Sequence, residues 1–77
     1  MLSVKVFPNP ASRYLHIQYQ GPPNARIELF DSEGRRRLVR AGVKNNLTIS
    51  VEELPKGVYW LKATTTQQQV VTKIMIQ

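Results

Sequence analysis

The sequence contains no cysteine, one histidine and only five acidic residues, and each scarcity excludes a class of function. Without cysteine there can be no disulfide framework, no thiolate metal site and no cysteine nucleophile. His16 has no second histidine with which to bind a metal, and the serines lack a plausible histidine and acid set for nucleophilic catalysis. General acid–base catalysis needs carboxylates in a desolvated cleft, whereas these fall mostly in expected turns. The sequence therefore predicts no catalytic residue, no metal site and no cofactor.

Long apolar runs are also missing. No stretch approaches the ~18 apolar residues of a membrane span, and the residues that follow Met1 do not form the apolar core of a signal peptide. The 77 residues suffice for one small domain, and a hydrophobic content of 42% is too high for a disordered tail. We therefore expect residues 1–77 to form a single globular module.

The apolar residues that are present alternate with polar ones. In residues 14–19, Leu15, Ile17 and Tyr19 share one face, which is typical of a strand buried on one side. The other candidate strands are residues 4–6, 25–31, 36–41, 47–51, 59–64 and 69–76. Turn residues separate these segments at a spacing of about 8–12 residues, which predicts an all-β, antiparallel sandwich or barrel of about seven strands.

In two of the segments between candidate strands, the residue types predict the backbone conformation. Pro8, Asn9 and Pro10 cannot lie in a central strand, because the two prolines lack a backbone N–H, so we expect an extended or turning connector there. Residues 31–34 read as a type I turn in which Asp31 bonds its own backbone and Gly34 takes a positive φ.

Residues 54–59 resemble the tyrosine corner of immunoglobulin-like sandwiches, in which a tyrosine hydroxyl bonds to backbone upstream. Here Leu54 would cap the core, Pro55 would stiffen the turn, and Gly57 would supply a permissive backbone before Tyr59. Trp60 follows on the opposite face. It lies either in a second packing layer or exposed to solvent, where it would be a candidate contact.

A basic cluster of Arg35, Arg36 and Arg37, with Arg40 nearby, dominates the net charge of +6. These guanidiniums could contact phosphate or an anionic polysaccharide. They could instead make an edge strand that resists aggregation, and we favour this interpretation. Aromatic stacking platforms do not alternate with the basic residues, so nucleic-acid binding is not indicated.

Taken in order, these motifs resemble the C-terminal sorting domain (type A) of type IX secretion system cargo proteins. The resemblance is carried by residues 6–11, by Leu15 and Ile17, and by residues 25–34, 49–61 and 70–77, with Lys73 in the place of a basic residue of the terminal strand. It implies an immunoglobulin-like sandwich that follows an N-terminal cargo domain, so Met1 is expected to be an artificial start. It also implies a signal that directs the cargo from the periplasm through the outer-membrane translocon to the cell surface or medium. A sortase-type protease then usually removes the domain, which is not itself an enzyme.

Within that resemblance we expect a folded recognition surface. Lys73 is the expected charged contact on the terminal strand, and Gly34 and Gly57 are expected to keep the turns in shape. Pro8, Asn9 and Pro10 would present an extended segment to the protease. Exposed terminal strands could also pair edge to edge into a weak homodimer.

Two other functions remain open from the residues alone. An immunoglobulin-like adhesion or carbohydrate-binding module would use Trp60 and the arginines 35–37 as contacts. Nucleic-acid binding by a basic module is the third and weakest hypothesis.

Overall fold

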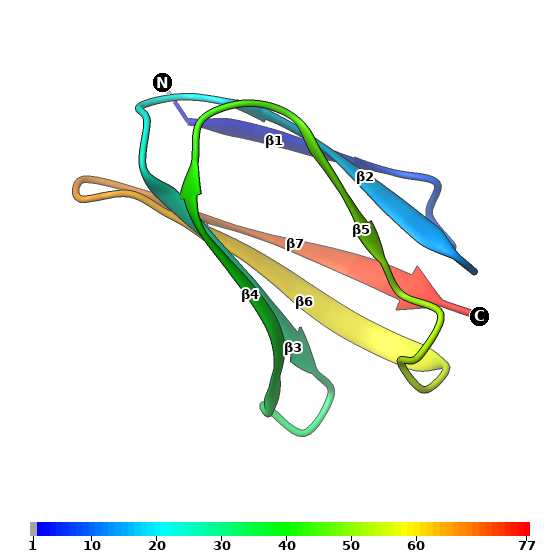
Figure 1. Ribbon diagram of the computed structural model, residues 1–77. Helices are drawn as coiled ribbons and strands as arrows, with labels where there is room; N and C mark the ends of the chain where they lie inside the picture. Colours follow the sequence, from blue (N-terminus) through cyan, green and yellow to red (C-terminus); the bar gives the residue numbers. More distant parts are fainter. Residues whose placement is uncertain (1) are drawn as a thin grey trace.

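The computed structural model describes residues 2–77, and these form seven β-strands in two layers (Figure 1). Met1, the expected artificial start, lies outside the described residues. The strands are β1 (Ser3–Phe7), β2 (Tyr14–Gln20), β3 (Ala25–Asp31), β4 (Arg36–Val43), β5 (Leu47–Ser50), β6 (Gly57–Thr64) and β7 (Gln69–Ile76). The predicted all-β class with seven strands is confirmed.

The strands divide into a three-stranded sheet, β1-β2-β5, and a four-stranded sheet, β4-β3-β6-β7, with antiparallel pairing between the neighbouring strands. β2 and β3 follow one another in the chain but lie in opposite sheets, and so do β5 and β6. Crossovers of this kind characterise the Greek-key connections of immunoglobulin-like sandwiches.

The core lies between the two sheets, where the alternating apolar residues meet. Leu15 and Ile17 of β2 face Leu29 of β3 and Leu61 of β6, and none is more than 1% exposed. Each side chain of this size contributes about 1.5–3 kcal/mol when it leaves water. The faces predicted from the period-two pattern are therefore the buried faces.

Strand β4 is longer than the predicted residues 36–41. The pairing of β3 with β4 shifts register between Ala25 and Ile27, so that Val43 lies opposite Ala25 and Arg40 opposite Ile27. A bulge inserts extra residues on one strand and increases its twist. This extension carries Val43 into the core, where it is buried.

Candidate functional site

The terminal strand β7 carries the predicted contact residue Lys73. Its pairing with β6 places Lys73 opposite Trp60, and both side chains are exposed, whereas the next residue, Ile74, is fully buried. The ammonium nitrogen of Lys73 lies 6.0 Å from the centroid of the Trp60 ring, at the limit of a cation–π contact. Trp60 is 42% exposed, which decides between the two predicted placements in favour of a surface position.

The other edge of β7 is occupied by the segment that follows β1. The side-chain nitrogen of Asn9 donates to the carbonyl of Lys73 at 3.4 Å, and its oxygen accepts from the N–H of Met75 at 3.0 Å. Ala11 then donates to the carbonyl of Met75 and accepts from the N–H of Gln77, both at 2.8 Å. We call Asn9 and Ala11 the edge clasp, because they close the outer edge of residues 73–77.

Pro8, Asn9 and Pro10 form a connector outside the strands, as expected, and all three residues are exposed. They follow β1 within the sandwich, and Asn9 is tied to β7 on its far side. Ala11, directly after them, is completely buried and forms a parallel bridge with Ile76.

The predicted tyrosine corner is present. The Tyr59 hydroxyl donates to the carbonyl of Pro55 at 2.5 Å, and its ring is buried. Leu54 packs partly buried against the core, and Gly57 enters β6 with a φ of 147°. Sequence reasoning missed a similar contact in β2, where the Tyr19 hydroxyl donates to the carbonyl of Pro22, also at 2.5 Å. The signal for it was a tyrosine followed by a glycine and prolines.

The β3–β4 hairpin closes as predicted around Asp31. Gly34, at a φ of 83°, donates its N–H to the carbonyl of Asp31 at 3.0 Å. One carboxylate oxygen of Asp31 accepts the backbone N–H groups of Glu33 and Arg35, each at 2.9 Å. The bond from the Arg35 backbone is the main cause that lowers the pKa of Asp31 below its ordinary value of 3.8.

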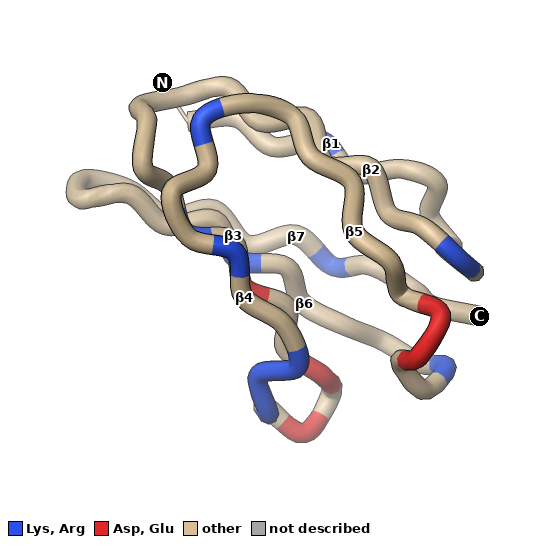
Figure 2. The backbone as a smooth tube through the Cα atoms, viewed as in Figure 1, with Lys and Arg blue, Asp and Glu red and all other residues tan. Residues whose placement is uncertain are grey.

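The arginine cluster is paired with carboxylates. Arg35 contacts Asp31 at 3.1 Å and Glu33 at 2.8 Å, while Arg37 lies 3.5 Å from Asp31. Arg36 of β4 contacts Glu28 of the neighbouring strand β3 at 3.2 Å. Figure 2 shows this meeting of basic and acidic residues at the hairpin. Because internal carboxylates already occupy the three guanidiniums, an external anion has to compete with them.

Several predicted residues meet in one shallow hollow of about 170 Å³, which the hairpin and the tyrosine corner form together. Its lining includes Asp31, Arg35, Arg37, Pro55, Gly57 and Tyr59. Lys73 and Asn9 are not among its lining residues and meet at the edge of β7 instead. The predicted site residues therefore form two groups rather than one.

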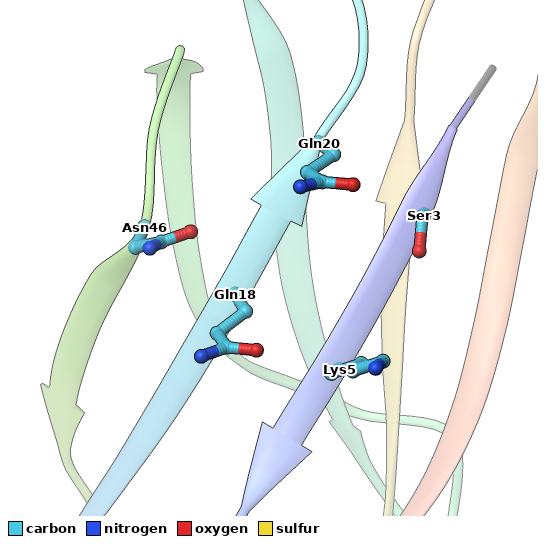
Figure 3. Close-up of a pocket in the computed structure, with 5 residues that line it drawn as sticks. All are labelled: Ser3, Lys5, Gln18, Gln20 and Asn46. Atoms are coloured by element: carbon cyan, nitrogen blue, oxygen red, sulfur yellow. The ribbon is translucent and has the colours of Figure 1, made fainter.

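A separate polar hollow of about 200 Å³ lies on the three-stranded sheet (Figure 3). It is lined by Ser3, Lys5, Gln18, Gln20 and Asn46. These side chains can exchange hydrogen bonds with a ligand but include no carboxylate or imidazole for proton transfer. His16 is exposed nearby, with its Nδ1 atom 2.8 Å from the Thr48 hydroxyl.

Within residues 2–77, no group of three histidine, cysteine or acidic side chains is placed to hold a metal ion. The same residues include no helix long and apolar enough to cross a membrane.

A model of a known protein family matches the chain. The family model for the secretion system C-terminal sorting domain matches residues 5–77, which include the edge clasp, the tyrosine corner and the whole of β7. No curated protein matches the chain.

Proposed function

Because the chain belongs to the family of secretion system C-terminal sorting domains, the sorting signals of type IX secretion, we propose that its folded β7 strand is the element that the machinery reads. Such a domain is a secretion tag for an N-terminal cargo and implies export to the cell surface or the medium. It does not belong to a catalytic family.

We propose that the cargo first reaches the periplasm and that the outer-membrane translocon then recognises the folded domain. A sortase-type protease separates the domain from the cargo after translocation. The predicted weak homodimer would form through sheet edges other than residues 73–77, since the clasp occupies that edge.

The observation that supports β7 as the recognition element is the fixed position of Lys73. The strand is hydrogen-bonded to β6 on one edge and to the clasp on the other. Its neighbour Ile74 is buried, which anchors the backbone. The backbone of Lys73 is thus held from three sides, so the side chain projects from a fixed point of the sheet, and a preorganised contact binds with less loss of entropy.

The turn residues have a supporting role in this proposal. Gly34, Leu54, Pro55, Gly57 and Tyr59 hold the hairpin and the corner that flank the same sheet. Arg35, Arg36 and Arg37 stabilise the hairpin through their carboxylate partners rather than contact an anion. A carbohydrate-binding function is not favoured, although Trp60 is exposed.

The test is a periplasmic reporter fused ahead of the chain in a host with the type IX system. Deleting residues 73–77 should abolish export, but it also removes the buried Ile74 and Ile76 and can unfold the domain. Lys73→Glu keeps the core and should reduce export at an unchanged fold, whereas Lys5→Glu, on the three-stranded sheet, should not. Export that is unchanged by both the deletion and Lys73→Glu would show that β7 is not read.

A further inference from the structure

The outer face of the four-stranded sheet carries most of the exposed large apolar side chains of the described residues. Cross-strand pairing places Phe30 beside Trp60 and Val58 beside Met75. We call these four residues, together with Val71, the apolar platform. Trp60, Val71 and Met75 are 42%, 53% and 39% exposed, and Phe30 and Val58 are partly buried. Contiguous apolar patches on a small domain mark interaction sites.

The platform has a basic rim. Lys73 lies in the same cross-strand row as Phe30 and Trp60, and Lys62 lies in the next row, opposite Val71. Among the strand residues of this face the only acid is Glu28, which is buried and paired with Arg36. The rim is therefore positively charged and complementary to an acidic surface.

The occupied edge of β7 restricts how a partner can bind here. An open edge could accept a partner's strand through its backbone groups. The clasp takes up the carbonyls of Lys73 and Met75 and the N–H groups of Met75 and Gln77. A partner that approaches residues 73–77 of the folded domain must therefore contact the side chains of the sheet face.

A cargo domain that precedes β1 would enter at one end of the four-stranded sheet. Near the N-terminal end, the backbone N–H of Leu2 donates to the side chain of Gln68, in the turn between β6 and β7. Val58 and Met75 lie at the opposite end of the same two strands, six residues from the end of the ladder, or about 20 Å. A domain that precedes β1 begins at the far end of the sheet from this part of the platform.

We propose that the platform docks a protein surface with an apolar centre and an acidic rim, provided by the outer-membrane secretion machinery. The inference rests on the proposed function. A second copy of the chain is a poor occupant, because face-to-face pairing would bring Lys73 and Lys62 of both copies together. A lipid surface is also disfavoured, since the half-exposed side chains lie on a sheet and none is on a protruding loop.

The test places a photo-crosslinking amino acid at position 60 of the reporter fusion, in the type IX host. The matched control places it at position 14, since Tyr14 is also exposed but lies on the three-stranded sheet. We expect an adduct with a protein component of the type IX outer-membrane machinery from position 60 and not from position 14. Lys73→Glu should lower the yield about tenfold, the effect of about 1.4 kcal/mol at a charged rim.

Equal yields at positions 60 and 14, an adduct with lipopolysaccharide, or an adduct of two fusion chains would each overturn the inference. So would a yield that Lys73→Glu leaves unchanged. If the fusion without the crosslinker is not exported, the proposed function fails and the inference fails with it. If that fusion is exported and only the crosslinking result is negative, the inference alone is wrong.

Discussion

Asn9 binds Met75 across 66 positions of sequence, its side-chain oxygen accepting a 3.0 Å hydrogen bond from the Met75 backbone. The contact joins the connector after the first strand to the outer edge of the last. With Ala11, it closes the part of β7 that would otherwise be free to pair with another chain. The proposed recognition of β7 depends on this closure, since it leaves the side chains on the face of the strand accessible to a partner.

Removing the clasp side chain should loosen the terminal strand. Asn9→Ala loses both hydrogen bonds to β7 and should lower the free energy of unfolding by about 1–2 kcal/mol. Asn9→Asp keeps the acceptor for Met75 and should lose less. Urea denaturation measures both, and Asn45→Ala, in an exposed loop, is the matched control. An Asn9→Ala variant as stable as the parent would show that the clasp is not stabilising.

The tyrosine corner should stabilise the fold through the single hydroxyl group of Tyr59. Tyr59→Phe keeps the buried ring and removes the bond to the Pro55 carbonyl, so we expect a loss of about 1 kcal/mol in urea. Tyr14→Phe removes an exposed hydroxyl and should leave the midpoint unchanged. If the two variants have the same midpoint, the corner bond adds nothing to stability.

The charge on Asp31 should stabilise the domain only above acidic pH. Its pKa is lowered in the fold, mainly by the Arg35 backbone bond, so the unfolded chain binds a proton more readily. The stabilisation is therefore complete above the ordinary value of 3.8 and is lost as pH falls through the folded pKa. Asp31→Asn retains an acceptor oxygen but removes the charge. Thermal unfolding should show Asp31→Asn melting below the parent at pH 7, with the gap narrowing below pH 3.8. A gap that does not depend on pH would contradict this.

Substitutions at Gly34, in the β3–β4 hairpin, should change the stability of the domain through backbone conformation. Gly34 has a φ of 83°, and a Cβ placed on it would meet no atom within 4 Å. Gly34→Ala should therefore cost about 1–2 kcal/mol through conformation alone, without a clash. Gly34→Asn should cost less, because asparagine tolerates positive φ better than alanine. Equal losses in urea for the two variants would refute this explanation.

The fold was predictable because the local patterns agree with one another. The alternation of Leu15, Ile17 and Tyr19 fixes a buried face without knowledge of the partner strand. The corner at Tyr59 and the turn at Asp31 are likewise local, since their partners lie within four residues. Such features can be read from one segment of the chain.

The clasp and the burial of Glu28 were not predictable, because both depend on the arrangement of the strands in the folded topology. Nothing near Asn9 in the sequence points to Met75. Alternation places Glu28 opposite the buried face, but it is 7% exposed because β3 is an interior strand and Arg36 lies against it. The strand order determines both the Asn9–Met75 contact and the burial of Glu28. The alternation of apolar and polar residues along one strand does not reveal that order.

The central claim is that this domain directs export by the type IX machinery. The most direct test fuses a folded periplasmic reporter ahead of the chain and measures its location in a type IX host and in an otherwise identical strain without the translocon. The account predicts reporter in the medium or on the cell surface of the first strain and only in the periplasm of the second. Reporter that remains in the periplasm of both strains, or leaves both, would contradict it.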